Sequence, residues 1–131
     1  SRGQAPYGCI ITKDHHIIAA AHNQVGLRQD ATAHAEMLAI QEAQSVLGAT
    51  QLTGCILYTT AEPCPMCAGA VLWSEVDTVV YGVSIQDIVE AGGKQIMMSL
   101  QDIVNQSPRD LQVIGGVMRD ELMLLYQRHY L

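Results

Sequence analysis

The chain has 131 residues, 49% of them hydrophobic, which indicates one compact domain over residues 1–131. No apolar stretch approaches the roughly 18 residues that a membrane span requires, and no signal-peptide pattern opens the sequence, so we expect a soluble, cytoplasmic protein with no membrane partner. The net charge is −6 with only seven lysines and arginines, which disfavours a large nucleic-acid-binding face.

Hydrophobic periodicity and turn residues predict strands that alternate with helices. In chain order we expect strands 7–13 and 17–23 as a hairpin around a turn at 14–16, helix 33–47, strand 55–60, helix 65–74, strand 78–83, helical segments 85–91 and 97–105, strand 111–114, and a closing helix over 118–130. Asp30 or Thr32 is placed to cap the first helix, and Gly48 to end it. This order predicts an α/β domain whose mixed sheet is covered on both faces.

Four side chains with metal and proton chemistry come from two short motifs. His34 and Glu36 are one residue apart, and Cys64 and Cys67 belong to Pro-Cys-Pro-Met-Cys. Zn²⁺ prefers imidazole and thiolate ligands, and three protein ligands leave a fourth position for a water whose pKa falls to about 7. Glu36 is not needed as a ligand, so it is free to carry protons between that water and a substrate. The two motifs predict one catalytic zinc ion per chain.

Each motif alone allows another interpretation. Cys64 and Cys67 have the spacing of a redox pair or of half a structural zinc site, and His34 could be a polar residue beside a helix cap. A redox pair leaves His34 and Glu36 unexplained, and a structural site lacks a fourth ligand at a usual spacing. The two motifs together, each opening a helix, favour the catalytic site. Cys9 and Cys55 lie in strand-like runs, and we interpret them as buried hydrophobic residues.

The segments 30–36 and 62–67 resemble the matching motifs of the cytidine deaminase superfamily, and the likeness extends from residue 6 to about residue 92. The resemblance implies a three-layer α/β/α fold with a five-stranded mixed sheet between helices. It further implies a set of site residues: the zinc ligands His34, Cys64 and Cys67, the proton carrier Glu36, and substrate contacts from Asn23, Ala35 and Ala61.

Two branches of that superfamily are most similar, the bacterial guanine deaminases and the tRNA adenosine deaminases. Trp73 falls where the guanine deaminase branch has a tryptophan that lines the base pocket. After Gly92 that branch continues with an aromatic residue and an acidic pair that engages guanine, whereas this chain continues with Gly93, Lys94 and Gln95. The superfamily usually has a helix before the first strand, and we expect that helix to be missing or truncated here.

We therefore expect a zinc-dependent hydrolytic deaminase that acts on a free nucleobase or nucleoside, with guanine-like purines favoured. The first alternative is a tRNA adenosine-to-inosine deaminase, which the low positive charge disfavours. The second alternative is a noncatalytic binding module stabilised by zinc. The resemblance also implies a homodimer.

Overall fold

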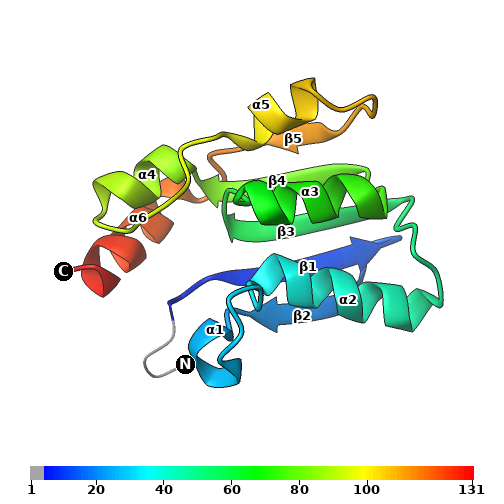
Figure 1. Ribbon diagram of the computed structural model, residues 1–131, viewed down its shortest axis with the longest axis horizontal. Helices are drawn as coiled ribbons and strands as arrows, with labels where there is room; N and C mark the ends of the chain where they lie inside the picture. The colour runs from blue at the N-terminus through cyan, green and yellow to red at the C-terminus, as the bar shows by residue number, and fades with distance from the viewer. Residues whose placement is uncertain (1–4) are drawn as a thin grey trace.

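The structure is a computed structural model that describes residues 5–131. Its strands form one sheet in the order β2-β1-β3-β4-β5, with helices on one face and at one end (Figure 1). The elements are β1 Gly8–Lys13, β2 His16–His22, α1 Val25–Arg28, α2 Ala35–Leu47, β3 Cys55–Ala61, α3 Pro65–Ser74, β4 Thr78–Val83, α4 Ile85–Glu90, α5 Leu100–Asn105, β5 Gln112–Ile114 and α6 Arg119–His129. The expectation about a helix before the first strand falls outside the described residues.

The sheet is mixed, as expected from the resemblance. β1 pairs antiparallel with both β2 and β3, whereas β3, β4 and β5 run parallel to one another. The hairpin of β1 and β2 is confirmed, with a turn shorter by one residue than expected. Its turn residues are Asp14 and His15, with φ of 50° and 65°, the left-handed values that join two strands tightly. His16 is already part of β2.

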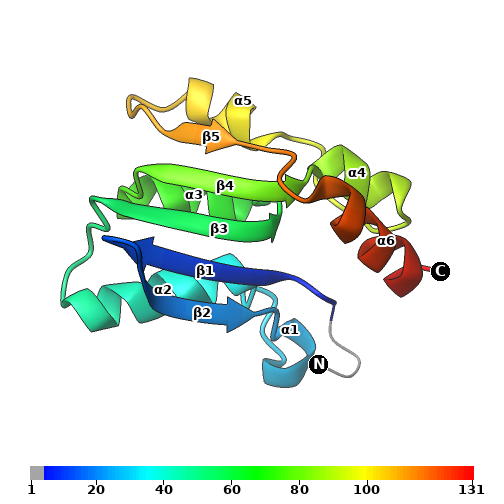
Figure 2. The same ribbon diagram turned by 180° about the vertical axis from the view of Figure 1, so that it is seen from behind.

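The two faces of the sheet are covered unequally. α2, α3 and α5 lie over one face (Figure 1), and Ile11, Leu57 and Val79 point toward them with 0% exposure. Seen from behind, α6 lies at one end of the other face (Figure 2). Ile17 and Tyr58 on that second face are 64% and 37% exposed. The α/β class is confirmed, but among the described residues the cover of the second face is limited to α6.

Local side-chain chemistry shifts several element boundaries. α2 begins after His34 as its N-cap, whereas the Asp30 carboxylate accepts hydrogen bonds from the N–H and hydroxyl of Thr32 and forms a turn ahead of the helix. Gly48 ends α2 in the left-handed conformation, as expected. The hydroxyl of Ser99 accepts from the backbone of Asp102, so α5 starts at residue 100 and not at 97. Cys9 and Cys55 are buried and free, as expected.

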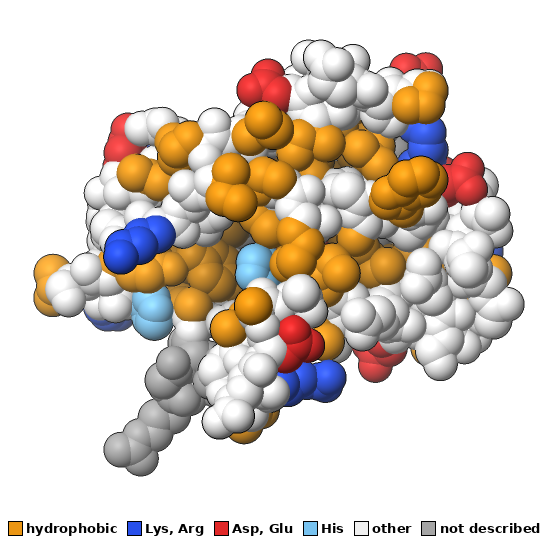
Figure 3. All heavy atoms as spheres, viewed as in Figure 1, with side chains coloured by type: hydrophobic (Ala, Val, Ile, Leu, Met, Phe, Trp, Pro, Cys, Tyr) orange, Lys and Arg blue, Asp and Glu red, His pale blue; other side chains and the backbone are white. Residues whose placement is uncertain are grey.

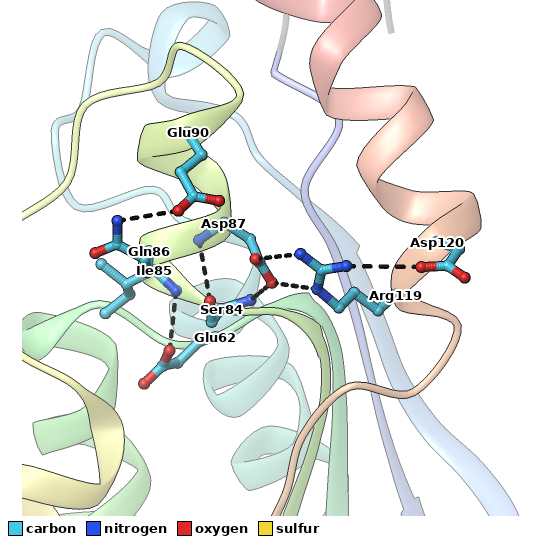
Figure 4. Close-up of polar contacts among 8 residues, drawn as sticks. All are labelled: Glu62, Ser84, Ile85, Gln86, Asp87, Glu90, Arg119 and Asp120. Atoms are coloured by element: carbon cyan, nitrogen blue, oxygen red, sulfur yellow. Dashed lines mark hydrogen bonds and ion pairs between the residues drawn. The ribbon is translucent and has the colours of Figure 1, made fainter.

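α6 is fixed to α4 through a capping box and an ion pair (Figure 4). The hydroxyl of Ser84 accepts from the backbone N–H of Asp87, and the Asp87 carboxylate accepts from the backbone N–H of Ser84. The same carboxylate accepts from Arg119 Nε at 3.0 Å and Nη2 at 2.7 Å. One side chain therefore caps α4 and holds the start of α6. None of the helices within residues 5–131 has the length and apolar character of a bilayer span.

Candidate metal centre

The predicted ligands meet at one end of the sheet. His34 is the N-cap of α2, Cys64 is the N-cap of α3, and Cys67 lies in the first turn of α3. Pro65 occupies the first position of α3, where its missing N–H costs nothing and its fixed φ suits the helix. Both helix N-termini lie at the end of the sheet where β3 and β4 finish (Figure 1), which is where α/β sheets place ligands.

The spacing of the three donors fits a tetrahedral zinc site. His34 Nδ1 lies 3.5 Å from Cys64 Sγ and 3.6 Å from Cys67 Sγ, and all three donor atoms lie within 4.8 Å of one another. With Zn–N near 2.1 Å and Zn–S near 2.3 Å, a tetrahedral angle separates nitrogen from sulfur by about 3.6 Å. The donors are therefore already at metal-binding separations, and Nδ1 is the imidazole atom that faces the sulfurs.

The electrostatics of the cluster favour a thiolate. Hydrogen bonding from Cys67, together with the His34 imidazole, lowers the pKa of the Cys64 thiol to about 4. The hydrogen bond with Cys64 in turn raises the pKa of His34, and the pKa of Cys67 is raised because its thiol donates to Cys64. Zinc binds cysteine as a thiolate, and Cys64 is in that form near neutral pH.

Glu36 lies beside the donors and is not one of them. It is in the first turn of α2, is only 6% exposed, and is outside the donor cluster. Burial raises the pKa of its carboxyl to about 7. A carboxyl with this pKa can both accept and donate a proton near neutral pH, as general acid–base catalysis requires.

A pocket of about 450 Å³ opens over these residues. Its lining comprises Tyr7, Asn23, Val25, Ala31, His34, Ala35, Glu36, Ala61, Glu62, Cys64, Met66, Lys94, Gln95, Ile96 and Tyr130. The size suits a nucleobase or a nucleoside. Hydrophobic side chains gather in the middle and upper part of the face seen in Figure 3, and charged side chains lie mainly at its margins. The pocket lining therefore contains Asn23, Ala35 and Ala61, three of the four expected substrate contacts, together with Glu36 and the donors His34 and Cys64.

Trp73 lies outside this pocket. Its side chain is 88% exposed near the end of α3, and it does not belong to the pocket lining. It follows Cys64 by nine residues, and a helix advances about 1.5 Å per residue, so it is displaced by about 14 Å along the helix axis. Trp73 therefore does not line the pocket formed by the described residues, and its expected contact with a base stays a prediction.

Glu62, just before the first cysteine, has a structural role that the motif did not indicate. It is 8% exposed, and its two carboxylate oxygens accept from the backbone N–H groups of Ile85 at 2.9 Å and Leu100 at 2.6 Å. The bond to Ile85 is visible in Figure 4. Glu62 thereby joins the starts of α4 and α5, the two helices that flank the segment contributing residues 94–96 to the pocket.

Sequence reasoning gave no site role to nine pocket residues: Tyr7, Val25, Ala31, Glu62, Met66, Lys94, Gln95, Ile96 and Tyr130. The hydroxyls of Tyr7 and Tyr130 are 2.5 Å apart although the two residues are 123 positions apart in the chain. No local pattern reports such a contact. The pair Gly92-Gly93 was the one available signal, since adjacent glycines often mark a close approach of the backbone.

The fold and the donor set together define a zinc-binding α/β domain. The chain belongs to the cytidine and deoxycytidylate deaminase family, because the sequence model of that family's zinc-binding region matches residues 1–83. The family assignment agrees with the cluster of His34, Cys64 and Cys67, and the cofactor is zinc.

Two curated relatives represent different substrates. The guanine deaminase of Bacillus subtilis (strain 168) is 52% identical over 87 residues, which cover 66% of this chain and 56% of that protein. The tRNA-specific adenosine deaminase of the same organism is 41% identical over 120 residues, covering 92% of this chain and 72% of that protein. The alignment thus spans just over half the length of the guanine deaminase.

Solved structures that match the chain include proteins from the same two branches. The guanine deaminase from Nitrosomonas europaea matches with a TM-score of 0.83 at 31% identity, over 97% of this chain and 73% of that chain. A structure from work on tRNA:A34 deaminases matches with a TM-score of 0.77 at 28% identity, over 91% of this chain and 83% of that chain. The expected fold is therefore confirmed, and both branches are similar to the chain.

Proposed function

We propose that the chain is a zinc-dependent hydrolytic deaminase of a nucleobase or nucleoside, with guanine-like purines favoured. The observation that carries the proposal is the buried Glu36 carboxyl, which lines one pocket together with the metal donors His34 and Cys64. A structural zinc site has no need of a buried carboxyl beside its ligands.

The proposed reaction replaces an amino group with a carbonyl. Zinc held by His34 Nδ1 and the sulfurs of Cys64 and Cys67 would supply Lewis-acid chemistry toward a water in the pocket. Glu36 accepts the proton of the attacking water and delivers it to a ring nitrogen. A new carbon–oxygen bond forms, the carbon–nitrogen bond breaks, and Glu36 passes the second proton to the leaving amine, which departs as ammonia.

The remaining proposed contacts orient the ring. Asn23 presents a side-chain amide at the pocket, and an amide can both donate to and accept from a base. Ala35 and Ala61 are 0% and 5% exposed and have small side chains, so the flat ring can approach Glu36 closely between them.

The alternative substrate, adenosine in tRNA, is less well supported by the surface charge. Two of the arginines are occupied within the chain: Arg109 donates to the carbonyl oxygens of Leu72 and Val76, and Arg119 pairs with Asp87. Phosphate contacts by lysine and arginine provide most of the affinity for nucleic acid. A tRNA substrate would show a steep loss of activity with rising salt, whereas a free base would not.

A single domain that works as a homodimer in the cytoplasm completes the proposal. Its support is the family resemblance alone. Light scattering of the purified chain would measure twice the monomer mass of 14.2 kDa if the dimer forms.

The test is an ammonia-release panel with zinc-loaded protein. It includes guanine, guanosine, adenine, adenosine, cytosine and an anticodon stem-loop, each at two salt concentrations. Glu36→Gln should keep its zinc, measured by metal analysis, and lose ammonia release. Glu42→Gln is the matched control, because Glu42 is an exposed residue of the same helix and should keep full activity. Full activity of Glu36→Gln would exclude the proposed role, and zinc binding without any ammonia release by the unaltered protein would favour the noncatalytic module.

A further inference from the structure

The segment between α4 and α5 contributes one lysine to the pocket lining. Lys94 is the only lysine or arginine among the pocket-lining residues that the structure describes. The carboxyls among them are Glu36 and Glu62, and both oxygens of Glu62 already accept backbone hydrogen bonds. Lys94 is exposed at this lining and is its one cationic donor among the described residues. Glu36 is the only lining carboxyl without both oxygens engaged in this way.

The backbone that carries Lys94 is held in place by packing. A side-chain carbon at Gly93 would lie 2.7 Å from Ile88 Cγ2 and 3.0 Å from Tyr130 Cζ, so a larger residue does not fit there. The N–H of Gly93 donates to the carbonyl of Ile88 at 2.9 Å. Tyr130 is itself bonded through its hydroxyl to Tyr7. The backbone at Gly93, directly before Lys94, is thus held by contacts with α4 and with the residue that follows α6.

The chemistry of an ammonium group selects among purines. It donates hydrogen bonds and accepts none. Guanine presents two acceptors, O6 and N7, on one edge, and lysine is a common partner of that pair, whereas adenine places an amino donor beside N7. We infer that Lys94 is a specificity-determining residue that binds the O6 and N7 edge of a 2-amino-6-oxopurine. A 6-aminopurine would turn an N–H donor toward the ammonium group.

The inference rests on the proposed deaminase function and names the substrate class of the same pocket. It also explains how a guanine-like base could be recognised without an acidic pair after Gly92. A good side-chain contact to a base edge is worth about 1–3 kcal/mol of discrimination, which corresponds to roughly 5- to 150-fold in kcat/KM. Loss of the Lys94 ammonium should therefore be measurable in steady-state kinetics.

The experiment compares guanine with 2-aminopurine, which has the same 2-amino group and lacks O6. Both kcat/KM values are measured for the unaltered protein, Lys94→Met and Lys94→Arg. Where 2-aminopurine is not turned over, its competitive inhibition constant takes the place of kcat/KM. Lys13→Met is the matched control, because Lys13 is the only other lysine and ends β1 at the opposite end from the pocket. Zinc content and circular dichroism verify that each variant is folded.

We expect Lys94→Met to lower kcat/KM for guanine by about tenfold and to leave the value for 2-aminopurine within about twofold, with Lys94→Arg retaining the preference for guanine. Equal losses on both substrates, or no loss on guanine, would overturn the role of Lys94 and leave the deaminase function standing. An unaltered protein that releases no ammonia from any purine would overturn both.

Discussion

Replacing Glu62 should destabilise the protein strongly although the residue is neither a proposed ligand nor a proton carrier. Its oxygens accept from Ile85 and Leu100, whose side chains are 4% and 0% exposed. Glu62→Ala would leave two backbone N–H groups without partners in a buried region. Each unpaired buried group costs about 1–3 kcal/mol, so the expected loss is about 2–6 kcal/mol. That is a large share of the roughly 5–15 kcal/mol by which a domain is stable.

A graded series separates the hydrogen bonds from the volume of the side chain. Glu62→Gln keeps one acceptor oxygen and should lose about 1–3 kcal/mol, or roughly half of the alanine effect. Glu90→Ala is the control, because Glu90 is exposed and its one hydrogen bond is with Gln86, so its expected change is below about 0.5 kcal/mol.

Urea unfolding of the zinc-loaded variants measures these differences. Far-ultraviolet circular dichroism is the suitable signal, because the only tryptophan, Trp73, is 88% exposed and its fluorescence would report little on unfolding. A loss below about 1 kcal/mol for Glu62→Ala would refute the reasoning, since it would mean that the two N–H groups find other partners at little cost.

Three further predictions follow from the fold and the metal centre. Asp87→Asn should lower the free energy of unfolding by about 2 kcal/mol near pH 7. Because Arg119 lowers the pKa of the Asp87 carboxyl below its usual value of about 3.9, the difference from the unaltered protein should shrink as the pH falls below that value. A difference that grows in acid would contradict the ion pair. Gly82→Ala should lower the melting temperature, because the added carbon would lie 2.7 Å from the carbonyl oxygen of Thr60. Gly69→Ala is the control, because a carbon added there meets open space and should be neutral or stabilising. Equal effects of the two substitutions would refute the packing argument. Chelation of zinc should lower the melting temperature in calorimetry, and added zinc should restore it. Free zinc at a thousandfold excess over Kd should stabilise the folded protein by about 4 kcal/mol. An unchanged transition would show that the ion contributes nothing to stability.

Sequence reasoning found the elements with strong local signals. The helix over residues 65–74 and the strand over residues 78–83 agree with α3 and β4 at both ends, since Pro65 and the β-branched run mark them. α1 was missed because a helix of four residues has no periodicity to detect. The helix expected from residue 97 begins at residue 100 instead, because Ser99 is its N-cap and the hydroxyl of a capping residue competes with a continued helix.

The candidate site likewise has features that the sequence predicts and features that it does not. His34, Glu36, Cys64 and Cys67 were predictable because the spacing within each motif determines which side chains share a helix start. The imidazole atom that faces the sulfurs was not predictable, because it depends on the packing of α2 against α3. That Trp73 lies outside the pocket lining was also not predictable, because the resemblance gave a role to a position without giving the direction of its side chain.

The interior contains two hydrophobic clusters, with Tyr7 packed against both, and the metal donors and α6 rest on different ones. Ala35, Ala39 and Ala68, from the helices that carry the donors, belong to the larger cluster under the sheet. α6 packs through Met123 and Tyr126 on the smaller cluster at the sheet end. Hydrogen exchange should therefore detect opening of α6 at a lower free energy than opening of α2 and α3. In mild denaturant the affinity for substrate would weaken while the ion stays bound.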